Sequence, residues 1–163
     1  MKYFSRFALI IALILSVSNR VSAQYVTIPD PNFRAFLQQI SNLSACFNAQ
    51  GKLDTTCTAL LNVTSLSCDN QNIASIEGIK YFKNLETLYC TNNVLTSMPK
   101  LPNSLTYLDC QQNQILSFYA FPTVLNQLNC SGNPLNCLPT LPNSLHFLRT
   151  TNTAITCIPN RPS

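Results

Sequence analysis

The sequence predicts a mostly β solenoid of the α/β class: an arc with one parallel sheet, extended polyproline-like return segments and a short N-terminal helical cap. Three observations support this prediction. A unit anchored on Cys68, Cys90, Cys110 and Cys130 recurs at intervals of 22, 20 and 20 residues. Each unit opens with the apolar and polar alternation of a one-sided β-strand. Most units then run into a proline-bearing stretch, which favours an extended chain over a long helix.

The repeat unit reads L-x-x-L-x-C-x-x-N-x-L-x-x-L-P-x-L-P-x-S, and LETLYCTNNVLTSMPKLPNS and LNQLNCSGNPLNCLPTLPNS match it closely. In the third copy we expect Leu108 and Cys110 to point inward, and Tyr107, Asp109 and Gln111 to point outward. One copy cannot bury its apolar side alone, whereas stacked copies can. The sequence therefore predicts five stacked repeats over residues 63–163, with atypical copies at the two ends.

This unit resembles the leucine-rich repeat, whose L-x-x-L-x-L-x-x-N/C-x-L core it follows. The LPxLPxS second half is similar to the short 20-residue bacterial class of these repeats. The segments VTIPDPNFRAFL and IEGIKYFKNLETL resemble the entry region and first repeats of exported leucine-rich-repeat proteins of Bacteroidetes-type bacteria. Bacterial effectors that carry LPxLPxS repeats and are injected into host cytosol differ, because they normally lack the N-terminal segment described next.

Residues 1–23 have the pattern of a secretory signal peptide. MKYFSR is basic, FALIIALILSV is an apolar run of 11 residues, and Val21-Ser22-Ala23 offers a small-residue cleavage site. The run is shorter than the roughly 20 residues that span a bilayer, so we expect no transmembrane segment after cleavage. Of ten basic residues, three leave with this segment. The remaining seven, against six acidic ones, give a net charge of +1 and no basic stripe for nucleic acid.

Residues 24–62 are predicted to form the helical cap. Asp30 can cap a helix that has Pro31 at its first position, and Phe33, Leu37 and Ile40 then recur at helical spacing. This helix should cover the first repeat. At the other end no matching cap is visible, so the strand at Leu148 is expected to be an open edge. Dimerisation of two copies through it, a shortened chain and a short tolerated edge remain alternatives.

The eight cysteines fall into two classes. Four of them, which we call the cysteine ladder, occupy the inward repeat position and are expected to pack as small apolar side chains: Cys68, Cys90, Cys110 and Cys130. A disulfide between rungs is the alternative. The other four are expected to form two disulfides, which an exported chain can keep oxidised. Cys46 and Cys57 flank one loop of the cap, and Cys137 and Cys157 replace serines of earlier copies on adjacent rungs.

Three asparagines, Asn93, Asn113 and Asn133, follow the cysteine anchors by three residues and form what we call the asparagine ladder. A buried asparagine can satisfy turn backbone groups that have no strand partner, so a structural role is expected.

Function is expected on the outward strand positions, because folding asks little of them. The predicted ligand-binding face consists of seven such side chains: Tyr89, Tyr107, Asp109, Gln111, Asn129, Phe147 and Arg149. Aromatic and arginine side chains are typical anchors of protein interfaces, so the expected partner is a protein; a structural, adhesive or glycan-contacting role is the alternative. The single His146, the absence of a CxxC pair and the lack of nucleophile or phosphate-loop motifs argue against an enzyme, a metal site or a cofactor.

Overall fold

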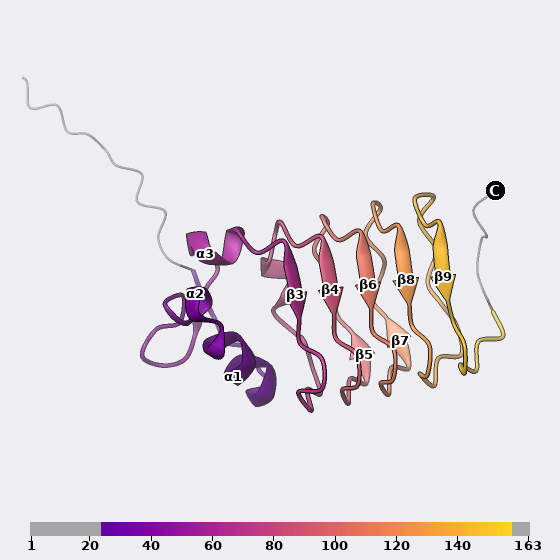
Figure 1. Cartoon of the computed structure of the whole chain (residues 1–163), viewed down its shortest axis with the longest axis horizontal. Coiled ribbons are helices and arrows are strands. Elements are labelled where there is room, and N and C mark those ends of the chain that lie inside the picture. The colour runs from indigo at the N-terminus through magenta and orange to yellow at the C-terminus, as the bar shows by residue number, and fades with distance from the viewer. Residues whose placement is uncertain (1–23, 158–163) are drawn as a thin grey trace, which may run out of the picture.

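The computed structural model describes residues 24–157, so the predicted signal peptide and the last six residues lie outside it. The chain forms a solenoid with its helices at one end of a row of parallel strands (Figure 1). The predicted fold class is confirmed. None of the helices in residues 24–157 is long and apolar enough to cross a membrane.

The cap is built around α1 (Pro31–Gln39), followed by the short helices α2 (Ser41–Ser44) and α3 (Thr58–Leu61). As expected, the Asp30 carboxylate caps α1 by accepting the backbone N–H of Phe33 at 2.7 Å. An antiparallel pair, β1 (Tyr25–Val26) with β2 (Leu53–Asp54), was not expected from the sequence.

Asp30 also joins the cap to the first repeat. Its second carboxylate oxygen accepts the backbone N–H groups of Ala74 and Ser75 at 2.9 and 3.1 Å. Gly78 adopts a φ of +106° in the same repeat, and a Cβ there would collide with the Ile28 side chain of the cap. One buried carboxylate and one close glycine contact thus fix the cap on the edge of the solenoid.

Five strands form the main parallel sheet, in the order β3 (Ser65–Ser67), β4 (Thr87–Tyr89), β6 (Tyr107–Asp109), β8 (Gln127–Asn129) and β9 (Phe147–Arg149). The register pairs residues 22 positions apart between β3 and β4 and 20 apart in every later pair, as the repeat intervals require. The longer first copy places its extra residues in a short 3-10 helix, η1 (Ile79–Tyr81), on the return side.

The return segments are more regular than predicted. Ser97–Met98 (β5) and Ser117–Phe118 (β7) pair as a second parallel sheet, and Cys137 and Cys157 form an isolated parallel bridge. Polyproline-type segments make no such hydrogen bonds, so the extended return takes the β-paired form at these residues. Because these copies have equal length, each return position lies next to the equivalent position of the neighbouring turn. The free backbone groups of the two positions then pair.

The asparagine ladder lies inside the turns. The Asn93 amide donates to the carbonyls of Cys68, Cys90 and Thr91, while its oxygen accepts the backbone N–H groups of Gln71 and Ile73. Asn113 and Asn133 repeat the three amide contacts one and two turns later, and their oxygens accept the backbone N–H groups of Leu95 and Ile115. Each of these side chains links two neighbouring turns through groups that the strands leave unpaired.

Candidate functional site

The outward side chains of the five-stranded sheet, which we call the sheet face, line up in columns because the strands are parallel and in register. One column contains Ser65, Thr87, Tyr107, Gln127 and Phe147, and the next contains Ser67, Tyr89, Asp109, Asn129 and Arg149. These are the columns that the repeat alignment predicts. The candidate residues of β4, β6, β8 and β9 therefore lie on one continuous surface.

Two tyrosines form the centre of the sheet face. The ring centroids of Tyr89 and Tyr107 lie 5.2 Å apart at an interplanar angle of 47°. Both side chains are half-buried, so part of each ring is open to solvent. Partial burial raises the pKa of the Tyr107 hydroxyl, and the nearby Asp109 carboxylate raises it further. Tyr107 therefore stays a neutral hydrogen-bond donor on an apolar ring.

Arg149 and Phe147 form a second aromatic unit on β9. The Arg149 guanidinium carbon lies 5.6 Å from the centroid of the Phe147 ring, a cation–π distance. Phe147 is 46% exposed, so much of this large apolar side chain is open to solvent. The stacked cation and ring offer a partner both apolar area and donors of hydrogen bonds.

Asp109 and Asn129 correct the expectation that folding asks little of the outward positions. Each is only 8% exposed. The Asn129 amide donates to Asp109 Oδ2 at 3.1 Å, and Asp109 Oδ1 accepts the backbone N–H of Gln111 at 3.2 Å. Both side chains thus stabilise the sheet and the turn after it. They form the floor between the aromatic units and offer little free surface to a ligand.

The same use of polar side chains continues in the column after the strands. Asp69 Oδ1 accepts the backbone N–H of Thr91 at 2.6 Å, and Ser131 Oγ accepts that of Thr151 at 3.1 Å. Gln111 is half-buried at this position. The sequence signal was available: a short polar side chain that recurs beside a strand end can satisfy backbone groups there.

The cysteine ladder is buried throughout, with each residue at 0% exposure. The thiols of Cys68 and Cys110, for example, donate to the carbonyls of Tyr89 and Asn129 on the following strands at 3.4 and 3.5 Å. Burial raises the pKa of Cys68 and of Cys130 to about 12, and it raises the pKa values of Cys90 and Cys110 well above their ordinary value. Thiolate chemistry at neutral pH is therefore disfavoured.

The other four cysteines lie at disulfide distance in the expected pairs. Cys46 and Cys57 have Cα atoms 5.6 Å apart in the cap, and Cys137 and Cys157 have Cα atoms 5.0 Å apart on adjacent return segments. Within residues 24–157, no three His, Cys, Asp or Glu side chains gather in a way that could hold a metal ion.

Comparison with known proteins identifies the repeat. Residues 61–103 match the family model described as leucine rich repeats, in two copies. Among solved structures, a Shigella effector LRR domain aligns with a TM-score of 0.63 at 23% identity, over 80% of this chain and 58% of that one. YopM from Yersinia enterocolitica WA-314 aligns at 34% identity over 50% of this chain and 18% of its own, with a TM-score of 0.48. A search of curated proteins gives no match. The chain thus spans less than two thirds of either of these two structures.

Proposed function

We propose that this chain, which carries leucine-rich repeats, is an exported, non-catalytic scaffold that recognises a protein partner through its sheet face. The observation that carries the proposal is the pair of aromatic units, Tyr89 with Tyr107 and Arg149 with Phe147, aligned on one surface by the strand register. Leucine-rich-repeat proteins commonly serve as protein-binding scaffolds, and an extended face built from repeats suits that role.

The energetics of interfaces support the same residues. A few aromatic and arginine side chains usually carry most of the binding free energy, provided that surrounding contacts exclude water. On the sheet face these anchors already pack on each other, so their rotamers lose little entropy on binding. The buried Asp109 and Asn129 hold the floor rigid beneath them.

Export is proposed from the pattern of residues 1–23 and from the two cysteine pairs at disulfide distance, which an oxidising compartment would preserve. A bacterial origin, which the LPxLPxS units suggest, is part of the same proposal. The sheet face is then available to partners outside the cytosol.

The test begins with photo-crosslinking from a residue of the sheet face, in native cell envelope or host material, followed by purification of the captured protein. Binding is then measured with purified components. Tyr107→Ala/Arg149→Ala should weaken affinity at least about tenfold, the loss expected when interface anchors are truncated. The matched control, Tyr25→Ala/Lys52→Ala, also removes one tyrosine and one cation but lies in the cap, and should bind like the unmodified chain.

Three results would contradict the proposal. Equal binding by both double variants would place the contact elsewhere. Binding to a glycan array that depends on Tyr107 and Arg149 would favour the glycan-contacting alternative. Self-association that is lost when the open edge of β9 is blocked would instead indicate a homodimer through this edge strand.

A further inference from the structure

A cluster of lysines lies on the return side and includes no residue of the sheet face. Residues 24–163 contain only seven basic side chains, and three of them, Lys80, Lys83 and Lys100, line one hollow of about 440 Å3. None of the seven lining residues is acidic. Such a concentration of positive charge in a chain of net charge +1 requires an explanation other than general solubility.

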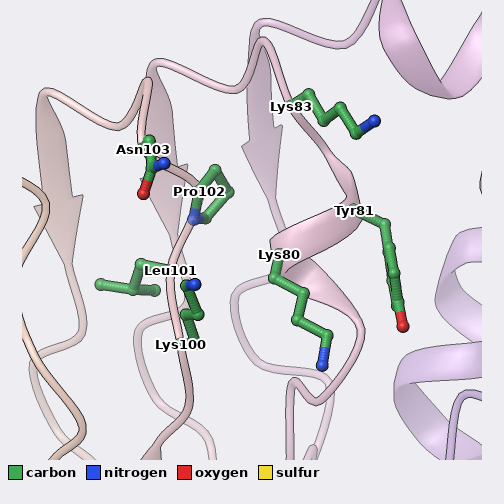
Figure 2. Close-up of a pocket in the computed structure, with 7 residues that line it drawn as sticks. All are labelled: Lys80, Tyr81, Lys83, Lys100, Leu101, Pro102 and Asn103. Atoms are coloured by element: carbon green, nitrogen blue, oxygen red, sulfur yellow. The ribbon is translucent and has the colours of Figure 1, made fainter.

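The hollow follows from the unequal lengths of the repeats. The first return segment contains the helical turn η1, whereas the next one, through Pro102, is extended, so the two backbones do not pack flush. Figure 2 shows Lys80 and Tyr81 projecting from the helical turn, with Lys83 just beyond it, and Lys100 to Asn103 on the facing segment. The Lys80 ammonium lies 5.3 Å from the centroid of the Tyr81 ring, which restrains it at the rim.

Two further hollows extend this one along the solenoid. One, also of about 440 Å3, shares Lys80 and Lys100 and reaches Tyr119; its rim includes one carboxylate, Glu77. The other shares Lys100 and runs to Phe121. Tyr119 is 71% exposed, the most exposed of the large apolar side chains described. Lys100 lies where the three meet, so they form one shallow channel across successive turns, which we call the lysine groove.

The lining indicates the chemical class of ligand. All three cations are lysines, whose ammonium groups act as compact point charges and are established binders of tetrahedral oxyanions such as phosphate. The groove is open to solvent and runs past several turns, so an extended chain can lie along it. Its exposed tyrosine ring and proline faces offer flat apolar platforms, and Asn103 adds a hydrogen-bond donor and acceptor. Flat platforms flanked by point charges suit a sugar chain that carries acidic esters.

We propose that the lysine groove binds a saccharide chain bearing sulfate or phosphate esters. The esters lie against Lys80, Lys83 and Lys100, and a sugar ring lies on the exposed ring of Tyr119. This site is separate from the sheet face, so it does not depend on the proposed function.

The test uses a fluorescein-labelled heparin hexasaccharide and the oxidised full-length mature chain, with binding followed by fluorescence anisotropy at low and high salt. Saturable binding that weakens as sodium chloride rises is expected, because the charges are solvent-exposed. Lys100→Gln should weaken binding about threefold to fivefold, as expected for one exposed charge contact. Lys52→Gln removes the same charge from the cap and should have no effect. All these lysines are exposed, so their replacement should not disturb the core. An unchanged circular dichroism spectrum verifies that each variant is folded.

Further arms separate the source of the anion. A desulfated hexasaccharide should bind at least tenfold more weakly, and Tyr119→Ala should weaken hexasaccharide binding while leaving competition by inorganic sulfate unchanged. The sheet-face variant Tyr107→Ala/Arg149→Ala should bind the hexasaccharide normally, so failure here and failure of the proposed function give different results. The proposal is overturned by absence of binding, by equal losses in Lys100→Gln and Lys52→Gln, or by tighter binding of a polyglutamate peptide.

Discussion

Replacing Asn113 with alanine tests whether the asparagine ladder stabilises the solenoid. The Asn113 oxygen accepts the Leu95 N–H at 3.0 Å, and its amide donates to the carbonyls of Cys90, Cys110 and Gln111 at 2.9, 3.1 and 3.2 Å. The side chain is 7% exposed, so water has little access to these groups. Each carbonyl also accepts a second donor: Cys90 from the Asn93 amide, Cys110 from the Asn133 amide, and Gln111 from the backbone N–H of Asn92. Alanine therefore leaves the Leu95 N–H without a partner and removes one of two hydrogen bonds from the carbonyls.

The expected loss follows from the cost of these changes. A buried polar group left without its hydrogen bond costs about 1–3 kcal/mol, and this applies to the Leu95 N–H. Each hydrogen bond lost from a carbonyl that keeps another donor costs about 0.5–1.5 kcal/mol, and local relaxation reduces the sum. We expect the free energy of unfolding to fall by about 2–4 kcal/mol.

The measurement is urea unfolding followed by circular dichroism and by tyrosine fluorescence, since the chain has no tryptophan. Asn143→Ala is the matched control, because Asn143 is exposed on a return segment, and it should change stability by less than about 0.5 kcal/mol. Asn113→Asp keeps the acceptor and removes both donors, so at pH 7 it should be at least as damaging as alanine. A loss below about 1 kcal/mol for Asn113→Ala, with an unchanged urea slope, would refute the structural role.

Three further predictions concern the cysteines. The cysteine ladder should resist alkylation at pH 8 in the folded chain and give four reactive thiols per chain in denaturant, counted by intact mass; fast labelling before unfolding would contradict its burial. Since burial raises the folded-state pKa of Cys68 and Cys130 from 9.0 to about 12, stability should fall as pH rises through this range, by up to about 1.4 kcal/mol per pH unit for each thiol. Cys68→Ala/Cys130→Ala should flatten that slope, and an unchanged slope would argue against the shift. Cys137→Ser/Cys157→Ser opens a cross-link with a sequence separation of 20 residues and should cost roughly 3 kcal/mol; hydrogen exchange should rise in β9 but not in β3, and a uniform rise would exclude a local staple.

The sheet could be predicted in detail because its register depends only on intervals between repeated residues. Ser65 pairs with Thr87 and Thr87 with Tyr107, at the same separations as the cysteine anchors. A parallel solenoid has no free choice of register once each copy buries the same apolar positions. The Asp30 cap was predictable for a similar reason, since its contact with Phe33 is local in sequence.

The return side could not be predicted to the same depth. Whether two extended segments form a sheet or run separately depends on the distance between neighbouring turns, which the sequence of one segment does not state. Met98 and Phe118 are both buried and pair in β5 and β7. The usable signal was the equal length of these copies, because a constant interval aligns every position of the turn and not the strand alone.

The burial of Asp109 was missed because exposure on a flat sheet depends on the size of the neighbours. Tyr89 precedes Asp109 in its column and Asn129 follows it, and the Asn129 amide donates to the carboxylate. An alternation pattern assigns a side chain to one side of the sheet and says nothing about how crowded that side is. Outward and exposed are therefore separate properties in a solenoid, and only the first can be read from periodicity.

The two proposed surfaces differ in origin, and this difference makes them separable by salt. The sheet face arises where the copies are alike, and its anchors are rings with one guanidinium already stacked on Phe147. Recognition there should depend weakly on ionic strength, because packing of apolar area is not screened. The lysine groove arises where one copy is two residues longer than the next, and its charges are exposed. Since exposed charges are screened at physiological salt, a ligand of the groove should be released at salt concentrations that leave a partner of the sheet face bound.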